Sequence, residues 1–198
     1  MNLKKLFDQQ RILRDRIGYN EPDRFDKLIL ALLVELGECA NEWRGFKFWS
    51  KNQEPRKWYE RKCHSCTGKG YFITNIYTSK KESCGFCRGT GFEEQKNPLL
   101  EEYVDGFHFV LEIGLELNFT ELHLIGTIAM PSYEIHELFT DIYGTSLLVK
   151  DTRNKVHYSI LVEEYLVLGE MFGFTREEIE TAYYVKNAVN HARQENGY

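Results

Sequence analysis

The sequence predicts an all-α protein with a small cysteine-rich insertion. Apolar residues recur at helical spacing through most of the 198 residues, and strand-like alternation is short and confined to one segment. That segment, residues 56–96, holds four of the five cysteines. A chain of this length suits one domain with a sizeable core better than two. We therefore expect a helical host, residues 1–55 and 97–198, interrupted by a separate module.

The charges of the host and of the expected insertion have opposite signs. Residues 56–96 hold nine Lys and Arg against four Glu, a balance of +5, whereas the remaining residues have a balance of −10. The net charge of −5 argues against a general nucleic-acid binder, because neutralising phosphates needs a basic surface. There is no apolar run of roughly 18 residues and no apolar core of a signal peptide at the start. The expectation is a cytoplasmic protein that does not enter a membrane.

The first three helices are expected on periodicity and end signals. The opening MNLKKLFDQQRILRDRI carries apolar residues in a helical stripe. A second helix, from about Pro22 to Glu42, is apolar nearly all round and should be central. Asn97 and Pro98 are suited to the cap and first turn of a third helix.

Three more helices are expected towards the C-terminus. SYEIHELFTDIYGTSLLV and NKVHYSILVEEYLVLGEMFGF both show helical periodicity. The last helix begins at TREE, where Thr175 and Glu178 form a capping-box pattern, and Gly197 lies near its end.

The cysteines form two knuckles, CHSCTGKG and CGFCRGTG, which share the pattern C-x-x-C-x-G-x-G. Cys63, Cys66, Cys84 and Cys87 can surround one tetrahedral zinc, and four protein ligands leave no open position, so this Zn²⁺ would be structural. Two disulfides are the alternative, which a reducing cytosol disfavours. The repeat resembles the cysteine-rich module of J-type chaperones. The fifth cysteine, Cys39, is expected to be a small buried hydrophobe.

An acidic line runs along the second helix. Glu35, Glu38 and Glu42 are spaced i, i+3 and i+7, and the same line continues backward through Ala31 and Leu28. The acids therefore extend an apolar stripe, whereas a solvated charged face would lie opposite it. Buried carboxylates without a cationic partner are costly.

A second acidic pair, Glu102 and Asp105, lies at the same spacing in the third helix. Two antiparallel helices would present Glu35, Glu38, Glu102 and Asp105 to one cavity. Because four facing carboxylates repel one another, we expect Mg²⁺, which prefers carboxylate oxygens. The alternative for either pair alone is an ordinary set of helix-surface acids.

The last helix adds cations and amides. Lys186, Asn190, Arg193 and Gln194 lie within roughly 100° of one another around its axis. Lys and Arg bind phosphate, and an Asn amide pairs with a base edge. A solvated final helix is the simpler interpretation of this segment alone. Combined with an acidic metal site, it predicts a pocket for a Mg²⁺-chelated nucleotide.

Three blocks in this order, ELGECANEWRGFKFWS, LLEEYVDGFHFVLEIG and KNAVNHARQENGY, resemble the signature blocks of the dimeric, all-α deoxyuridine triphosphatases. That family belongs to the all-α nucleotide pyrophosphatases, which include the MazG-type enzymes. LFDQQRILRDRI matches more weakly. The chain departs from the family pattern between about Pro55 and Lys96, where a shorter linker is usual.

The resemblance implies roles by position. Glu35, Glu38, Glu102 and Asp105 match ligands of two or more Mg²⁺ ions, and Glu35 and Glu38 are the candidate catalytic residues, with Glu35 accepting the proton of the attacking water. The residues implied in substrate binding divide into four groups. Lys186, Arg193 and Tyr198 match phosphate-binding residues, Gln10 and Asn190 match uracil-reading residues, Lys47 and Trp49 match the part that closes over the nucleotide, and Asn41 and His108 line the cavity.

The implied activity is Mg²⁺-dependent hydrolysis of dUTP, and of dUDP, to dUMP by a homodimer. Two alternatives remain open at this stage. One is a related pyrophosphatase acting on another pyrimidine nucleotide. The other is a zinc-dependent interaction module whose basic insertion binds nucleic acid or a protein.

Overall fold

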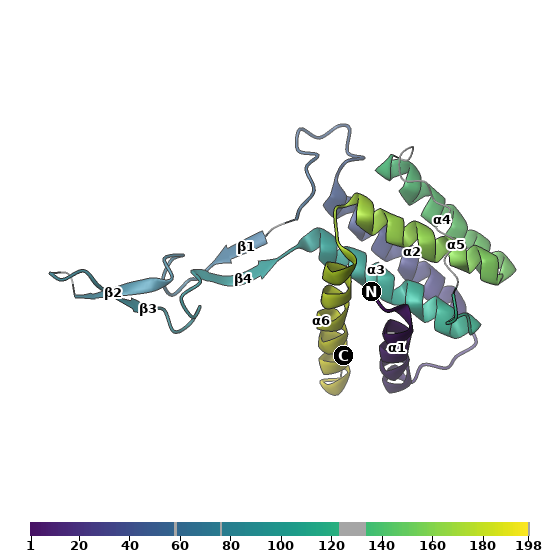
Figure 1. Ribbon diagram of the computed structural model, residues 1–198, viewed down its shortest axis with the longest axis horizontal. Coiled ribbons are helices and arrows are strands. Elements are labelled where there is room, and N and C mark those ends of the chain that lie inside the picture. The colour runs from purple at the N-terminus through teal and green to yellow at the C-terminus, as the bar shows by residue number, and fades with distance from the viewer. Residues whose placement is uncertain (58, 76, 123–133, 198) are drawn as a thin grey trace. The chain divides into compact units, whose positions relative to one another are not determined.

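The computed structural model describes residues 1–57, 59–75, 77–122 and 134–197. The chain divides into two compact units, Met1–Pro55 with Leu99–Tyr198, and Arg56–Pro98. The helices are α1 (Leu3–Ile17), α2 (Arg24–Trp43), α3 (Pro98–Leu117), α4 (Ile135–Thr152), α5 (Lys155–Met171) and α6 (Arg176–Glu195) (Figure 1). The strands are β1 (Tyr59–Lys62), β2 (Tyr71–Asn75), β3 (Lys80–Ser83) and β4 (Phe92–Lys96). The predicted all-α class is confirmed, since the described strands are short and lie only in the second unit.

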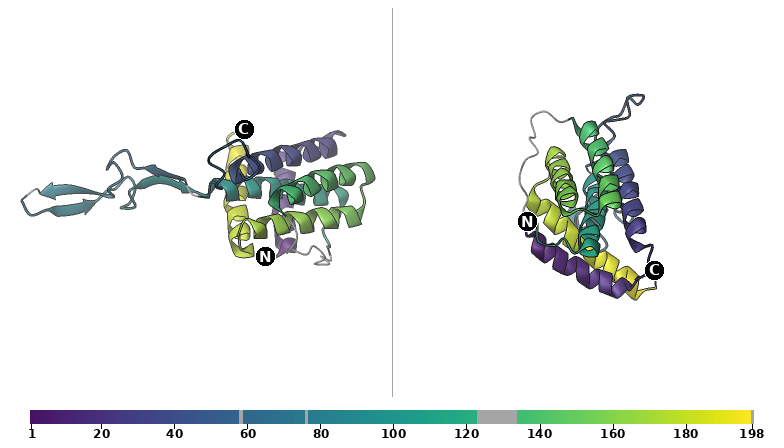
Figure 2. Two further views of the ribbon diagram at one scale, coloured as in Figure 1. Left: turned by 90° about the horizontal axis from the view of Figure 1, so that it is seen from above. Right: turned by 90° about the vertical axis from the view of Figure 1, so that its right-hand side faces the viewer.

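Side chains near the ends of the helices explain where they begin and stop. At α1, the Asn2 side chain accepts a hydrogen bond from the Lys5 amide, and Gly18 ends the helix in the left-handed conformation at φ 66°. At α6, Thr175 and Glu178 form the predicted capping box. These local signals set the first and last helices of the unit, which pack side by side (Figure 2).

Helix α3 is the centre of the helical unit. Twelve of its twenty residues are buried, and they include polar residues as well as apolar ones. Side chains on α3 bond to α1 through Gln10 and Glu112, and to α6 through Lys186 and Asp105. Helix α5 bonds to it through Tyr165. A central helix with so many neighbours has few solvent-facing positions, so its acids must find partners inside the unit.

Helices α3 and α5 are joined by a reciprocal pair of tyrosines. Tyr103 on α3 donates its hydroxyl to the Tyr165 carbonyl at 2.9 Å, and Tyr165 donates to the Tyr103 carbonyl at 2.8 Å. Both rings are fully buried. Gly106 makes room, because a Cβ there would lie 2.2 Å from the Tyr165 hydroxyl. Each bond contributes about 1 kcal/mol, and an unpaired buried hydroxyl would cost more.

The second unit consists of two antiparallel ladders with the cysteine knuckles between them along the chain. Strand β1 pairs with β4, and β2 pairs with β3. The two knuckles exchange backbone bonds, from Cys63 N to Gly91 O and from Cys84 N to Gly70 O, both at 2.8 Å. A Cβ on Gly70 would lie 2.4 Å from the Gly89 carbonyl oxygen, so glycine is required where the knuckles cross.

Within the part of the chain that the structure describes, none of the helices combines the length and the apolar character needed to cross a membrane.

The glycines of α3 provide a test of this packing. A Cβ on Gly114 would lie 2.1 Å from the Tyr158 hydroxyl, which donates to the α3 backbone, so Gly114→Ala should lower the free energy of unfolding by about 1–3 kcal/mol. A Cβ on Gly144 of α4 would meet only open space, so Gly144→Ala should raise the free energy of unfolding by about 0.5–1 kcal/mol. Urea unfolding followed by circular dichroism measures both, and the same sign for both would contradict the packing described.

Candidate active site and metal centre

Three carboxylates from two helices meet in one cluster. Glu35 and Glu38 come from α2, one helical turn apart, and Glu102 comes from the first turns of α3. One carboxylate oxygen of each lies within 4.8 Å of the others. The two helices are in contact here, since a Cβ on Gly106 of α3 would lie 3.5 Å from the Glu35 Cβ, an ordinary van der Waals distance. This small group of convergent oxygen atoms is suited to a hard divalent cation.

Burial and mutual repulsion make this cluster electrostatically unfavourable without a cation. Burial raises the pKa of Glu35 to about 7, and the negative charges of Asp105 and Glu38 add to the effect. Burial likewise raises the pKa of Glu102 to about 7, again with contributions from its acidic neighbours. Near neutral pH the two carboxyl groups are therefore close to half-protonated, and a bound divalent cation would favour the charged forms.

Asp105, the fourth predicted ligand, contacts a cation of the protein. Its Oδ2 atom accepts a short charge-assisted bond from the Lys186 ammonium on α6. A second α3 carboxylate, that of Glu101, lies 3.8 Å from the same nitrogen. Burial raises the pKa of Asp105, while Lys186 opposes that shift. Asp105 is thus next to the three-glutamate cluster, where its charge acts on Glu35, and it also fixes Lys186.

A cavity of about 470 Å³ begins at this cluster. Glu35 belongs both to the carboxylate cluster and to the cavity wall. Helices α1, α3 and α6 supply much of the remaining wall. The residues that the sequence predicted and that line the cavity are Gln10, Glu35, Asp105, His108, Lys186, Asn190, Arg193 and Gln194. Anion-binding and amide side chains therefore share one chamber with a carboxylate of the candidate metal site.

Gln10 is held in one orientation at the buried side of the cavity. Its amide nitrogen donates to Glu112 at 2.9 Å. Its oxygen accepts from the Tyr183 hydroxyl at 2.9 Å and faces Nδ1 of His108 at 2.8 Å. A carboxylate only accepts, so the nitrogen must face Glu112 and the oxygen must face the other two groups. The oxygen is saturated, which leaves one N–H of Gln10 for a ligand.

His108 is a neutral ring in this arrangement. It is 5% exposed and stacks on Tyr183, with ring centroids 4.2 Å apart. Burial lowers its pKa to about 3, and the nearby Lys186 charge acts in the same direction. A neutral imidazole that donates Nδ1–H to Gln10 adds no positive charge to the cavity. His108 is thus placed to shape the cavity and to support Gln10.

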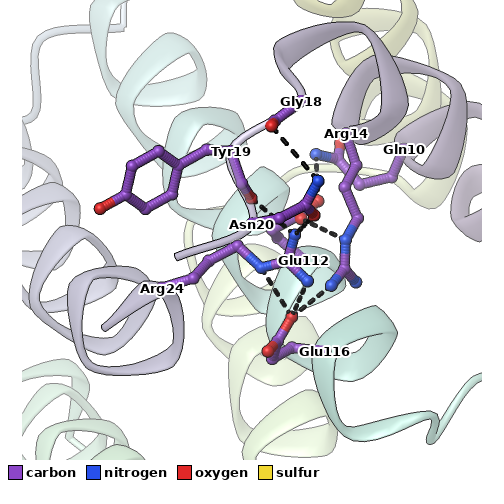
Figure 3. A network of polar contacts seen from close by, with 8 residues as sticks. All are labelled: Gln10, Arg14, Gly18, Tyr19, Asn20, Arg24, Glu112 and Glu116. Carbon is purple, nitrogen blue, oxygen red and sulfur yellow. Dashed lines mark hydrogen bonds and ion pairs between the residues drawn. The ribbon is translucent and has the colours of Figure 1, made fainter. Parts of the chain in front are cut away.

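A network of two arginines and two acids lies at the cavity wall, and the sequence analysis did not single out its members: Arg14, Arg24, Glu112 and Glu116. Arg24 donates to Glu116 through Nε at 2.9 Å, and Arg14 contacts the same carboxylate (Figure 3). Arg14 also lies 3.4 Å from Glu112. Burial raises the pKa of Glu112 to about 7, while Gln10 and Arg24 oppose the shift. The spacing of Asp105, Glu112 and Glu116 is a helical-face signal that extends the recognised acidic block.

The loop between α1 and α2 is attached to the same network. Arg24 donates to the Tyr19 carbonyl at 2.7 Å and to the Asn20 side chain at 2.9 Å, as Figure 3 shows. Tyr19 and Lys27 line the cavity and contact each other. These contacts depend on tertiary structure, and no local motif predicts them.

Other predicted substrate residues lie apart from the cavity wall. Among the described residues, Asn41, Lys47 and Trp49 do not line it. Trp49 is 65% exposed and its ring meets those of Phe46 and Phe48 edge-on. The segment that carries these aromatic rings follows α2 directly. Tyr198 is outside the described residues.

The four knuckle cysteines form a second candidate metal centre. All four are buried, and their sulfur atoms lie within 4.8 Å of one another. The Sγ–Sγ distances are 3.9 Å for Cys63–Cys84 and 3.8 Å for Cys66–Cys87. A disulfide needs about 2.05 Å, whereas thiolates about 2.3 Å from a tetrahedral zinc are separated by about 3.8 Å. The geometry suits zinc. Cys39 is buried in the helical core, as predicted.

Comparison with protein families gives a match to the family described as dUTPase, over residues 2–62 and 89–198. The matched residues cover most of the chain and include the carboxylate cluster and the helices that line the cavity. The gap between the two matched ranges, residues 63–88, contains all four knuckle cysteines, Cys63, Cys66, Cys84 and Cys87. Comparison with curated proteins and with solved structures gives no match.

The raised pKa values predict how stability should depend on pH when metal is removed. Glu35 and Glu102 have a pKa of about 7 in the folded protein, raised from the ordinary value of 4.5. Between these values the folded state binds more protons than the unfolded state, so stability should fall as pH rises. In EDTA, the unfolding midpoint should decrease between about pH 5 and pH 8, by about 2–4 °C for each kcal/mol lost.

Two controls assign that pH dependence to the cluster. Added Mg²⁺ should reduce the decrease, because it binds the ionised carboxylates. Glu35→Gln removes one titrating group and should flatten the EDTA profile. A midpoint that stays level or rises in EDTA, with the same profile for Glu35→Gln, would contradict the electrostatics described for the cluster.

Proposed function

Since the chain belongs to the dUTPase family, whose reaction is the hydrolysis of dUTP, we propose that the cavity binds dUTP with Mg²⁺ and releases dUMP and pyrophosphate. One observation carries the proposal: Glu35 is shared between a convergent carboxylate cluster and a cavity that also presents Lys186, Asn190 and Arg193. Carboxylates, cations and amides are the groups needed for the metal, the phosphates and the base. We extend the proposal to dUDP, which offers the same base and a shorter phosphate chain.

The donor set of the cluster fits Mg²⁺. We assign Glu35, Glu38, Glu102 and Asp105 as its ligands, because three of these carboxylates converge and the fourth is adjacent. Burial and neighbouring negative charges raise the pKa values of Glu35 and Glu102, and a bound cation would offset both effects. When bound, Mg²⁺ ions acidify water and neutralise phosphate charge.

Residues of the chain supply the remaining functions. Glu35 accepts the proton of the attacking water, a role suited to a carboxylate whose pKa lies near neutral pH. Lys186 is held beside the cluster by Asp105 and Glu101, where its ammonium faces the phosphate chain. Arg193 lies about two turns further along the same face of α6 and contributes a second positive charge.

The amides at the other end of the cavity are proposed to read the base. Uracil presents carbonyl acceptors and one N–H donor along one edge. Asn190 offers both a donor and an acceptor, whereas Gln10 has only an N–H left after its bonds to Glu112, Tyr183 and His108. Gln10 therefore donates to a uracil carbonyl, and Asn190 completes the edge.

The remaining expectations are also proposals. Lys47 and Trp49 would close over the nucleotide, Asn41 would line the same cavity, and Tyr198 would bind phosphate. Large apolar side chains are exposed on α2 and α4, among them Leu30, at 61%, and Leu147, at 47%, and a homodimer would cover such surfaces. We propose a cytoplasmic location, where the knuckle thiols stay reduced.

We further propose that residues 56–96 are an inserted zinc module with a structural role. The sulfur spacing supports one Zn²⁺, and backbone N–H groups of Gly70 and Gly91 donate to Cys66 and Cys87 at 3.1 and 3.3 Å. Such bonds stabilise thiolates. With four protein ligands there is no open position for a water or substrate.

The nucleotide specificity is tested by turnover of dUTP, dCTP and dTTP, measured as pyrophosphate release with and without Mg²⁺. We expect dUTP hydrolysis that needs Mg²⁺, and discrimination of at least about a hundredfold against the other two, since a site that reads polar groups leaves them unpaired with the wrong base. Equal rates on the three nucleotides would contradict uracil recognition.

A charge-removing variant controls for the metal site. Glu38→Gln keeps the shape of an exposed side chain and should lower turnover by more than about a hundredfold, because losing a direct ligand should cost more than losing a residue that only orients one. Circular dichroism should show an unchanged helical content. Near-normal hydrolysis by the folded variant would refute the assignment of the cluster.

Zinc should be needed by the module and not by the helical unit, because the buried apolar cluster of the described module consists only of the four cysteines. Elemental analysis should find one Zn per chain. Cys63→Ser with Cys66→Ser should increase hydrogen exchange within residues 56–96 and leave α2 and α3 protected, with Mg²⁺-dependent turnover retained. Global unfolding of this double variant would show that the module is integral to the helical core.

A further inference from the structure

The cysteine module carries a concentration of positive charge that the proposed hydrolysis does not use. Residues 56–96 have a balance of +5, and a zinc bound by four thiolates would leave about +3. The nine cations are all exposed: Arg56, Lys57, Arg61, Lys62, Lys69, Lys80, Lys81, Arg88 and Lys96. The module therefore presents a basic surface, whereas the rest of the chain has a net negative charge.

The acids of the module are partly neutralised by it. Glu93 accepts from the His64 amide at 2.6 Å and lies 3.4 Å from Arg61. Lys80 lies 3.5 Å from Glu82. Each pair cancels one negative and one positive charge, so the excess of positive charge on the module is unchanged. What remains suits a polyanion.

Apolar rings are exposed on the same module. Tyr77 is 99% exposed, Phe86 63% and Phe72 42%. The described part of the module has no apolar core besides its four cysteines. Rings of this size are ordinarily buried, and their exposure on a 43-residue unit indicates a binding surface.

The rings and the cations alternate along the module. In the β2–β3 ladder, Lys81 is paired with Ile73, and its ammonium lies 4.2 Å from the centroid of the Tyr71 ring. Phe86 is two residues from Arg88 on the second knuckle, and its ring meets that of His64 at 4.5 Å. Exposed rings on a surface that also carries lysines and arginines are the elements with which proteins hold unpaired bases and their phosphates.

We propose that the cysteine module binds single-stranded nucleic acid. Lysines and arginines contact the phosphates, and bases stack on Phe86, Tyr77 and Phe72. A duplex offers phosphates but keeps its base faces inside the stack, so it uses the cations alone. An acidic protein would also use the cations, but it has few planar groups that match three exposed rings.

This activity is separate from nucleotide hydrolysis. Residues 63–88, which carry all three rings and most of the knuckle residues, lie in the gap between the two ranges matched by the family. The carboxylate cluster and the cavity belong to the other unit. Loss of either activity therefore leaves the other to be measured.

The test is fluorescence anisotropy of a labelled, mixed-sequence DNA strand of about 15 nucleotides, a length that covers the usual site sizes. The full-length, zinc-loaded chain is titrated at several salt concentrations. We expect the logarithm of the association constant to fall linearly with the logarithm of the salt concentration, with a slope of about −0.7 for each phosphate neutralised. The matching duplex should bind at least about tenfold more weakly, because it offers no free ring faces.

Two double variants of the module and one control double variant on α1 locate the binding surface. Phe86→Ala with Tyr77→Ala should weaken binding of the strand by about tenfold or more for each ring and leave duplex binding unchanged. Lys69→Gln with Lys81→Gln should weaken binding of the strand and of the duplex, and should reduce the magnitude of the salt slope for the strand by about 1.4. Lys4→Gln with Lys5→Gln removes the same charge from exposed lysines on α1 and should change neither. One Zn per chain in each variant shows that the module remains folded.

Three results would overturn the proposal. The first is no binding of the strand by the zinc-loaded chain. The second is equal loss of binding from the α1 and module lysine variants. The third is an effect of the ring variants on binding of an acidic peptide, tested as polyglutamate, with none on the strand, which would assign the surface to a protein. dUTP turnover is expected to be unchanged in the module variants, so failure of the proposed hydrolysis is recorded separately.

Discussion

The helical unit depends on keeping several carboxylates inside a packed bundle. Glu35 and Glu102 are about half-buried and repel their acidic neighbours, yet the helices that carry them are held together by apolar packing on their other faces. The Tyr103–Tyr165 pair and the glycines of α3 hold α3 close to α5, and thereby fix the helix that carries Glu102. Apolar burial thus supplies the free energy that offsets the repulsion, and the resulting excess of negative charge is what makes the cluster selective for a cation.

The acids of α3 differ in how far the cations of the protein neutralise them. At its start, Glu102 is left without a cation of the protein among its principal interactions. One turn later Asp105 is shared with Lys186, and near its end Glu116 is held by two arginines. The negative charge that remains for binding an added cation is therefore greatest in the first turns of α3 and smallest in the last. A metal and its phosphates are suited to the first end, and a neutral base is suited to the middle, where Gln10 and His108 lie.

Much of this was predictable from the sequence because the signals are periodic or closely spaced. Helical spacing placed Glu35 and Glu38 on one face, and the capping pattern at Thr175 identified the start of α6. The cysteine spacing likewise indicated one cluster. Other features depend on residues far apart in the chain. The orientation of Gln10 follows from Glu112, about a hundred residues away, and the contact of Arg24 with Glu116 spans a similar distance. No periodicity encodes such pairs, and the family pattern that identified Gln10 does not reveal that its oxygen is already bonded.

The pairing of β1 with β4 has a consequence for how such a chain arises. Tyr59 is paired with Lys96, so the two ends of the cysteine module lie next to each other across one ladder. A segment whose ends meet can be placed in a connection between two helices without stretching it, because the host needs to span only the short distance between them. All four candidate zinc ligands belong to the module, so the proposed zinc site needs no residue of the host. The module is therefore portable: it can be gained, lost or exchanged as one piece while the helices before and after it keep their register.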